Sequence, residues 1–290
     1  MLNNIIILAG GASSRMKKET ANKAINKTTI AQANTRNKGL IEIGPNNIPF
    51  LDYLLYNIKQ AGYQSIFIVI GANDTMFPSI YGSKEANNTF NGLNISYVRQ
   101  HIPEGRTKPF GTADAVFQAM EQYPKLKTEA FAVCNCDNLY SIKVLRQLRQ
   151  TNSKNALMGY DRDALKFDEE RIAKFALMKL GNQNRLLTIL EKPRKTEVDH
   201  YRDPNGKLRV SMNIFKFDGK QFYPFLLNCP VHPERNEKEL PTALLNMVHE
   251  YPKSVEVIPV SEHVIDLTSK EDIGIVNTYL EDHYPNDLVW

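Results

Sequence analysis

The sequence predicts an α/β fold in which helices cover both faces of a central sheet that is mixed but mainly parallel. Three observations lead to this prediction. The chain begins with a run of β-forming residues that ends in two glycines, strands and helices alternate through the first half, and a later apolar strand runs into an aspartate. A chain of 290 residues is long enough for one such domain with an elaborated second half.

The first element is the segment 5–16, IIILAGGASSRM, which places a strand directly before Gly10 and Gly11. A strand that breaks into a glycine-rich turn presents backbone N–H groups at the sheet edge, where a phosphate chain can lie without meeting a Cβ atom. Arg15 follows with a planar guanidinium that can hold phosphoryl oxygens through two hydrogen bonds. The segment therefore predicts a cradle for a triphosphate.

Two widespread phosphate-binding motifs do not match this turn. A P-loop needs Gly-Lys-Ser/Thr at its end, and no such triplet follows Gly10. The dinucleotide fingerprint G-x-G-x-x-G also fails at this position. The alternative that stays open is an ordinary tight turn between a strand and a helix.

The next elements alternate between helix and strand. A helix is expected over 49–61, where leucines and an isoleucine form one apolar stripe and Gly62 marks the end. Apolar strands are expected over 65–70 and 95–99, and Gly111 opens a second amphipathic helix.

A strand over 130–134 then runs into Asn135, Cys136 and Asp137. Because open α/β sheets bind ligands at the carboxyl ends of their strands, this position makes Asp137 a candidate functional residue.

The second half of the sequence has a different pattern. Strands follow one another at 156–160, 174–180, 185–190 and 210–217 with short turns between them, which indicates antiparallel additions to the sheet. A helix over 240–251, a strand over 255–260 and a last helix close the chain. The tetrapeptide 268–271, Thr-Ser-Lys-Glu, has the pattern of a capping box and predicts that the last helix starts there.

Composition excludes several classes of protein. With 42% hydrophobic and 23% charged residues and no apolar run of membrane-spanning length, the chain is expected to be an ordinary globular protein that makes no membrane contact. The first strand starts at once, without a basic leader region, so we expect a cytoplasmic location. Cys134, Cys136 and Cys229 are expected to be reduced, because three cysteines form no disulfide framework and show no zinc spacing.

Basic residues gather in one segment. The range 17–36 holds five basic residues and one acidic residue, which accounts for the net charge of +4. A nucleic-acid surface would be wider and would carry interleaved aromatic residues, so no nucleic-acid partner is expected. The segment is either a loop that handles an anion or a solvated surface excursion.

Several motifs, in register along nearly the whole chain, resemble those of the sugar-phosphate nucleotidyltransferases, also called nucleotide-sugar pyrophosphorylases. The motifs are LAGGASSRM at 8–16, Lys38-Gly39-Leu40-Ile41 with Pro49-Phe50-Leu51, Gln100, Gly111-Thr112-Ala113-Asp114-Ala115, Asn135-Cys136-Asp137-Asn138, Glu191-Lys192-Pro193, Asn213 before 214–217, and Val264-Ile265-Asp266 before Thr268. The resemblance implies a three-layer α/β/α, Rossmann-like fold of the GT-A type with a smaller antiparallel sugar-binding subdomain. It also implies one domain over 1–290, with a mainly nucleotide-binding core (1–153), a mainly acceptor-binding part (154–262) and a C-terminal part with a metal aspartate (263–290).

The resemblance implies a reaction in which an oxygen of a sugar 1-phosphate attacks the α-phosphorus of a nucleoside triphosphate and releases pyrophosphate. Two anions must then approach each other while negative charge on the α-phosphoryl group is neutralised. Asp137 and Asp266 are the carboxylates expected to hold Mg²⁺, a hard cation that prefers oxygen ligands and keeps several waters.

The resemblance also assigns the other site residues. Arg15 is similar to the arginine that grips the triphosphate, Lys38 to a lysine that contacts phosphate from the opposite side, and Lys192 to the lysine that holds the sugar phosphate; with Asp137 they form the expected catalytic set. The expected nucleotide-binding residues are Ala9, Gly10, Gly11, Gln100, Gly111, Thr112 and Asp114, and within this set Gln100 and Gly111 are similar to the family's base-reading pair. The expected sugar-phosphate residues are Glu191, Lys192 and Asn213.

The chain also departs from the family's pattern. Cys136 stands where the family usually has glycine, so a side chain is expected where backbone and nucleotide come close. The interval 16–38 is longer than the usual spacing and is either a lid over the triphosphate or an unrelated insertion. The spelling SSRM is close to that of the molybdenum-cofactor guanylyltransferases and cytidylyltransferases, but the Glu-Lys-Pro motif and the late Asp266 agree better with a sugar-phosphate enzyme.

Two other functions stay open at this point. One is a nucleotidyltransferase for another phosphorylated acceptor, such as phosphocholine or a cofactor precursor. The other is a non-catalytic sensor of sugar nucleotides with the same fold, although a sensor has no need to keep metal carboxylates. The base, the sugar and the assembly state are not specified by the sequence.

Overall fold

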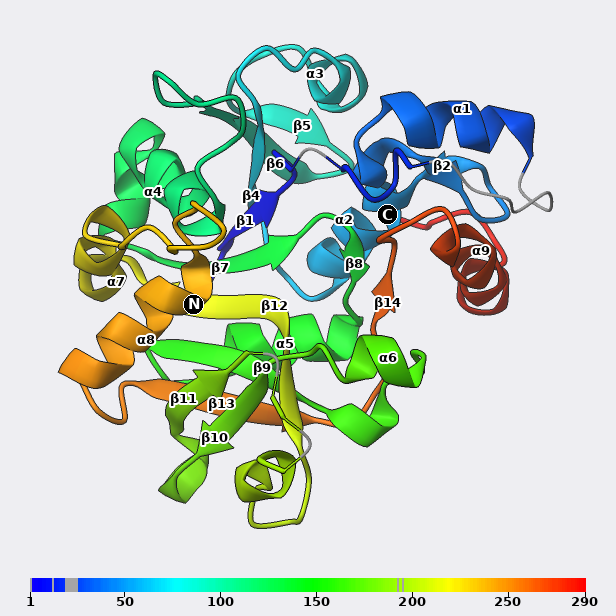
Figure 1. Cartoon of the computed structure of the whole chain (residues 1–290). Coiled ribbons are helices and arrows are strands. Elements are labelled where there is room, and N and C mark those ends of the chain that lie inside the picture. Colours follow the sequence, from blue (N-terminus) through cyan, green and yellow to red (C-terminus); the bar gives the residue numbers. More distant parts are fainter. Residues whose placement is uncertain (1, 12, 19–25, 192, 195) are drawn as a thin grey trace.

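The central sheet determines the architecture (Figure 1). The computed structural model describes residues 2–11, 13–18, 26–191, 193–194 and 196–290. Within them, one large sheet has the order β11-β10-β12-β7-β1-β4-β6-β5, and β9 and β13 extend it from β12.

The strands at the middle of the sheet are parallel. β1 (Asn4–Leu8) lies between β7 (Ala130–Asn135) and β4 (Ser65–Gly71), and β6 (Leu93–Gln100) follows β4. β1, β4 and β7 have nearly continuous apolar sequences, as expected when both faces of a parallel sheet are covered, whereas β6 also contains polar residues such as Asn94 and Arg99. All of these strands were expected from the sequence, with bounds that differ by only a few residues.

Two separate hydrophobic cores lie on the two faces of the sheet. Ile5 and Ile7 face the core that contains α2 (Phe50–Gln60) and α5 (Ile142–Gln150). Ile6 points the other way, into the core beneath the helices on the opposite face. These helices are α4 (Thr112–Gln122), α7 (Gly219–Leu227) and α8 (Leu240–Glu250). The predicted three-layer α/β fold is therefore confirmed.

The second half continues the same sheet with mostly antiparallel strands. β12 (Arg209–Asp218) pairs antiparallel with β7 and β9 (Asn155–Asp161), and β10 (Leu177–Leu180) pairs antiparallel with β11 (Leu186–Leu190). β13 (Val255–Val260) is parallel to β9. The mixed, mainly parallel sheet is confirmed, whereas the divisions at 153 and 262 stay a prediction.

Short elements complete the description. They are β2 (Glu42–Ile43), β3 (Ile48–Pro49), α3 (Met76–Tyr81), β5 (Asn88–Phe90), and the 3-10 helices η1 (Lys38–Leu40), η2 (Pro124–Lys127), η3 (Arg162–Ala164), η4 (Asn182–Asn184) and η5 (Val198–Tyr201).

The basic segment contains a helix that the sequence did not reveal. α1 (Lys27–Thr35) starts at Asn26, whose side chain accepts a hydrogen bond from the backbone of Thr29. Arg36, just after the helix, forms an ion pair of 2.8 Å with Glu42. These contacts fix the C-terminal part of the segment against β2, and residues 19–25 lie outside the described part of the chain.

The predicted start of the last helix is wrong. α9 (Asp272–His283) begins after the tetrapeptide 268–271. The carboxylate of Asp272 accepts hydrogen bonds from the backbone N–H groups of Thr268 and Ser269, at 2.9 and 2.6 Å. The Thr268 hydroxyl donates to Asp266 and accepts from Arg171, whereas in a capping box it would accept from a helix N–H group. A local contact from Asp272, the first residue of α9, therefore replaces the predicted capping box.

None of the helices in the described part of the chain is both long enough and apolar enough to cross a bilayer.

One buried carboxyl group makes stability depend on pH. Asp52 in α2 accepts a hydrogen bond of 2.7 Å from the Tyr81 hydroxyl, and burial raises the pKa of Asp52 to about 6. Since the folded protein binds this proton more tightly than the unfolded chain, stability is lost as pH rises from about 4 to 6. Asp52→Asn should remove that loss and stabilise the protein at pH 7.5 by about 1–2 kcal/mol. Denaturant titrations of both proteins at pH 4.5 and 7.5 measure the effect, and an unchanged pH dependence in the variant would contradict it.

Candidate active site

The glycine turn lies where the carboxyl ends of the parallel strands meet. The backbone of Ala9 donates to Val69 of β4 at 2.9 Å, and that of Cys136 donates to Leu8 at 3.2 Å. A cavity of about 250 Å³ opens at this edge of the sheet. Its lining includes Ala9, Gly11, Arg15, Lys38, Thr112 and Asp137. Six of the eleven residues predicted for the catalytic and nucleotide sites thus share one cavity.

A single buried side chain anchors the loop that carries Arg15. Met16 is fully buried in the core, whereas Arg15 beside it is exposed and lines the cavity. Ser13 has a positive φ of 52°, and the backbone N–H of Lys17 donates to its carbonyl. The turn and the buried methionine together direct the guanidinium toward the cavity.

The two glycines of the turn serve different purposes. A Cβ atom on Gly10 would lie 2.6 Å from Oε1 of Gln100, so the protein itself excludes a side chain there. A Cβ atom on Gly11 would meet no protein atom within 4 Å. Gly11 lines the cavity, and its missing side chain therefore leaves space for a ligand rather than for the protein.

Gly11→Ala tests whether a triphosphate lies against this turn. The added methyl group meets no protein atom, so Tm should stay within about 2 °C of the parent, while the KM for the nucleoside triphosphate should rise roughly 10-fold to 100-fold. Gly274→Ala in α9 is the matched control, because a Cβ atom there also meets nothing within 4 Å and the position is far along the chain from the turn. Steady-state kinetics decide the matter, and an unchanged KM in Gly11→Ala would show that no phosphate chain approaches the turn.

Lys38 and Asp137 form an ion pair in the wall of the cavity. Nζ of Lys38 lies 2.8 Å from Oδ2 of Asp137, and the lysine is 7% exposed. Asn37 fixes this segment, since its side chain donates to the carbonyl of Ala9 at 2.5 Å and accepts from the backbone N–H of Gly39 at 3.0 Å. Sequence reasoning missed Asn37, although an asparagine before Lys-Gly is a common start for a turn.

Cys136 occupies the place where a glycine was expected. Its side chain is buried, packs beside Gly39, and donates a hydrogen bond of 3.5 Å from Sγ to Oδ1 of Asn37. Burial raises the pKa of this thiol, so it stays protonated near neutral pH. The glycine at position 39 leaves room for the thiol in the wall behind Asp137.

The second predicted acid lies next to the first. β8 (Asn138–Leu139) and β14 (Ile265–Asp266) pair antiparallel with Asp266 opposite Asn138, and the backbone N–H of Leu267 donates to the carbonyl of Asp137 at 2.8 Å. Burial and the nearby charge of Asp137 raise the pKa of Asp266. The structure therefore brings together two carboxylates that are far apart in sequence.

A cation that the sequence analysis did not identify contacts the second acid. Arg171 in α6 (Glu169–Ile172) places Nη2 2.7 Å from Oδ2 of Asp266 and Nη1 2.7 Å from Oδ1 of Asp272. No sequence motif marks this arginine, because its contacts join α6 to Asp266 and Asp272, which lie far along the chain.

The donor set near the cavity agrees with a hard, oxygen-binding cation. No group of three or more His, Cys, Asp or Glu suitable for a metal occurs among the described residues. Two neighbouring carboxylates are what Mg²⁺ needs when substrate phosphates and waters complete its coordination. The assignment of Asp137 and Asp266 to Mg²⁺ stays a prediction.

Gln100 and Asp114 lie behind the glycine turn rather than in the cavity lining. The Gln100 amide is buried and donates to the carbonyl of Gly111 and to Oδ2 of Asp114, both at 3.3 Å. Its carbonyl oxygen faces Gly10. The structure connects the predicted nucleotide residues to one another, and their contact with a base stays a prediction.

The start of α4 is joined tightly to the segment before α8. Gly111 has φ +105°, and a Cβ atom there would lie 2.3 Å from the carbonyl oxygen of Lys238. The backbone of Ala113 donates to that carbonyl at 3.0 Å, and the Thr112 hydroxyl accepts from Leu240 at 2.9 Å. This position therefore requires glycine.

Two of the predicted acceptor residues, Glu191 and Asn213, do not line the 250 Å³ cavity. Glu191 is exposed and forms an ion pair of 2.7 Å with Arg235. Asn213 has φ +57° at an irregular point of β12, where the Tyr140 hydroxyl donates to its carbonyl at 3.2 Å. Lys192 lies outside the described residues. The roles of these residues stay predictions.

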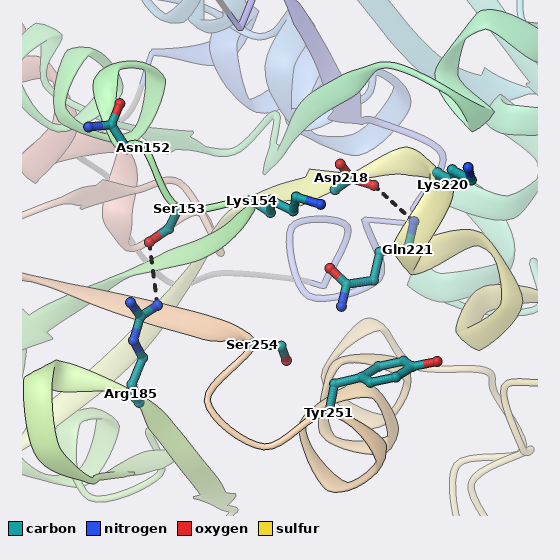
Figure 2. Close-up of a pocket in the computed structure, with 9 residues that line it drawn as sticks. All are labelled: Asn152, Ser153, Lys154, Arg185, Asp218, Lys220, Gln221, Tyr251 and Ser254. Atoms are coloured by element: carbon teal, nitrogen blue, oxygen red, sulfur yellow. Dashed lines mark hydrogen bonds between the residues drawn. The ribbon is translucent and has the colours of Figure 1, made fainter.

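A larger hollow of about 800 Å³ lies at the other edge of the sheet (Figure 2). It is bordered by the starts of β9 and β13 and by Asp218 at the end of β12, whose carboxylate caps α7 through Gln221. Cations such as Lys154 and Arg185 border it. Because ligands of open α/β sheets bind at the carboxyl ends of parallel strands, the smaller cavity is the better candidate for chemistry.

Comparison with known proteins gives a consistent result. The model of a family described as "Nucleotidyl transferase" matches residues 4–285. A glucose-1-phosphate adenylyltransferase of Koribacter versatilis is 22% identical over 283 residues, which are 95% of this chain and 62% of that protein. The small subunit of the Triticum aestivum glucose-1-phosphate adenylyltransferase is 26% identical over 196 residues, which are 65% of this chain and 37% of that protein. The chain thus spans less than two thirds of the length of these curated relatives.

Solved structures share the fold. A protein assigned as a glucose-1-phosphate thymidylyltransferase of Bacillus anthracis, determined with sucrose, superposes with a TM-score of 0.66 at 19% identity and 98% coverage of both chains. A UDP-glucose pyrophosphorylase bound to UDP-glucose gives a TM-score of 0.68 at 16% identity, with 98% of this chain and all of the other covered. These similarities confirm the GT-A-like fold.

Proposed function

Because this chain belongs to the nucleotidyl transferase family, we propose that it transfers a nucleoside monophosphate from a nucleoside triphosphate to a sugar 1-phosphate. The products are a nucleoside diphosphate sugar and pyrophosphate, and the proposed cofactor is Mg²⁺. The resemblance to sugar-phosphate nucleotidyltransferases is confirmed at the level of the family. The sugar 1-phosphate acceptor is supported by the names of the relatives, which act on glucose 1-phosphate or carry UDP-glucose.

One observation supports the proposal most directly: Gly11, Arg15, Lys38 and Asp137 face the same cavity at the carboxyl edge of the parallel sheet. A glycine turn without a side chain, two cations and a carboxylate are what a triphosphate and a divalent cation require. The alternative is an ordinary tight turn that binds no phosphate. Such a turn does not require Arg15, Lys38 or Asp137 beside it.

In the proposed reaction, Arg15 holds the departing pyrophosphate, since its exposed guanidinium reaches the cavity beside the bare backbone of Gly11. Lys38 contributes a second positive charge to the cavity lining, where Asp137 fixes its ammonium group. Asp137 and Asp266 would hold Mg²⁺, which would supply positive charge against the charge on the α-phosphoryl group. Each of these groups acts on charge, which is the main requirement in phosphoryl and nucleotidyl transfer.

The site does not need a general base. A sugar phosphate is already ionised near neutral pH, because the second pKa of a phosphate monoester is about 6. Its oxygen can attack the α-phosphorus without losing a proton to the protein. The described residues that line the cavity include no histidine, in agreement with this mechanism.

Release of pyrophosphate tests the proposed function. The protein is incubated with MgCl₂, each of the common nucleoside triphosphates and a panel of sugar 1-phosphates, with phosphocholine as another acceptor. We expect turnover with at least one sugar 1-phosphate and its loss in EDTA. Thermal shift with each nucleotide separates binding from turnover, since a ligand at ~100 times its dissociation constant adds roughly 2.7 kcal/mol of stability.

Each result has a definite meaning. If a nucleotide raises Tm but no combination of nucleoside triphosphate and acceptor releases pyrophosphate, catalysis is contradicted and the sugar-nucleotide sensor is favoured. Release with phosphocholine alone would contradict the sugar acceptor. The identity of the base and the sugar, the assembly state and a cytoplasmic location stay outside this proposal.

A further inference from the structure

Arg171 forms the ion pair that engages the second acid. Its guanidinium bridges two aspartates, with Nη2 2.7 Å from Asp266 and Nη1 2.7 Å from Asp272. The Arg171 side chain is 23% exposed and those of the two acids are 15% and 11% exposed, so the three charges are largely shielded from water. Ion pairs in such surroundings are weakened less by solvent and salt than surface pairs.

The two carboxylates differ in how many of their oxygens are engaged. Asp266 is held at both oxygens, because Thr268 donates to Oδ1 at 2.5 Å and Arg171 contacts Oδ2. Asp137 is held at Oδ2 by Lys38, and its Oδ1 has no hydrogen bond with the described residues. Asp137 therefore has an oxygen ready for a cation, whereas Asp266 does not.

Other contacts hold Arg171 even without Asp266. Its guanidinium carbon lies 4.3 Å from the ring centroid of Phe167, and Nη1 contacts Asp272. Asp272 itself is fixed by the backbone of Thr268 and Ser269. A small rotation that separates Nη2 from Asp266 would leave the arginine anchored by these partners.

We propose that Arg171 is a built-in counterion that a divalent cation has to displace from Asp266 before both acids can bind it. This inference rests on the proposed Mg²⁺ site of the nucleotidyl transfer reaction. Arg171 is a positioning residue rather than a catalytic residue, because it contacts Asp266, Asp272 and Phe167 and does not line the cavity. Its release couples occupancy of the cation site to the position of α6 in the acceptor half.

This proposal has a measurable consequence. Breaking the ion pair between Arg171 and Asp266 costs free energy, and this cost lowers the affinity of the site for the cation. Removing the guanidinium should therefore strengthen binding of the cation even though it weakens the fold. A purely structural role for Arg171 predicts the opposite, because loosening Asp266 and Asp272 would lower the affinity together with the stability.

Binding of Mn²⁺ alone, followed by electron paramagnetic resonance without nucleotide or sugar phosphate, tests this inference. Arg171→Met and Arg171→Gln should bind Mn²⁺ roughly 10-fold more tightly than the parent protein. Arg171→Lys keeps the positive charge and should stay within about 2-fold of the parent. Both Arg171→Met and Arg171→Gln are measured, so that a result is obtained even if one of the two variants does not fold.

Arg209→Met is the matched control. Arg209 also forms a buried ion pair, at 2.7 Å with Asp203, but that pair lies in the second half of the sheet and has no contact with Asp137 or Asp266. The control should lower Tm and leave Mn²⁺ affinity unchanged. Equal or weaker Mn²⁺ binding in both uncharged variants of Arg171 would overturn the inference.

Asp137→Asn separates this inference from the proposed function. If this variant loses Mn²⁺ binding while the Arg171 variants show no gain, only the counterion role is overturned. If Asp137→Asn binds Mn²⁺ like the parent, the cation does not occupy these acids, and the counterion role is overturned together with the Mg²⁺ site. The pyrophosphate assay then decides separately whether transfer occurs.

Discussion

Asp137→Asn is expected to lower kcat of nucleotidyl transfer by about 10³-fold, because the carboxylate charge beside the cavity is lost while its shape is kept. Asp137 offers the free oxygen of the site and fixes the ammonium group of Lys38 at 2.8 Å. An asparagine removes the charge and leaves the buried lysine without an anionic partner. The expected cost in stability is roughly 1–2 kcal/mol, a shift of a few degrees in Tm.

The measurement compares pyrophosphate release with thermal unfolding. Asp203→Asn is a matched control, since Asp203 also has a buried ion pair, with Arg209, away from the cavity. The control should lose stability without a comparable loss in kcat of the folded protein. If Asp137→Asn instead loses turnover only in proportion to its folded fraction, its assignment to the chemistry is wrong.

Arg15→Met is expected to lower kcat/KM for the nucleoside triphosphate by about 10²-fold to 10³-fold. Arg15 is exposed and held by the buried Met16 beside it, so its own side chain contributes little to the fold, and Tm should stay within about 2 °C. Arg15→Lys should recover only part of the loss, because a lysine cannot hold two phosphoryl oxygens in one plane.

Lys17→Met is the control for Arg15, because it removes a positive charge two residues away that does not belong to the cavity lining. We expect less than about a 3-fold change in kcat/KM for Lys17→Met, because solvent and salt screen a surface charge that does not line the cavity. A similar loss in both variants would show that the loop acts through its overall charge and that Arg15 has no specific contact with the triphosphate.

The sequence predicts the parts of the fold that depend on local pattern. The continuous apolar runs of β1, β4 and β7 and the stripe of α2 are visible in the letters, because buried parallel strands and amphipathic helices have characteristic periodicity. The glycine turn and Asp137 follow from their places at the ends of such strands.

The contacts that complete the site are not local, and the sequence does not reveal them. Arg171 reaches Asp266 from α6, far earlier in the chain, and no spacing rule connects the two. The capping box before α9 failed for a different, local reason, because the carboxylate of Asp272 accepts hydrogen bonds from the backbone N–H groups of Thr268 and Ser269. Asn37 was visible as a turn residue, but its bond to Ala9 depends on tertiary structure.

The joint between α4 and the segment before α8 bears on how substrate preference can change. Arg235 contacts Glu191, a predicted acceptor residue, and also Glu239, which adjoins the backbone that meets Gly111 and Thr112. A shift of the strap, residues 228–239 between α7 and α8, would therefore move the start of α4 beside the proposed nucleotide site together with Glu191, a predicted acceptor residue. Evolution of a new sugar preference through this strap would be accompanied by a change in nucleotide affinity, so the two selectivities are expected to drift together across homologues.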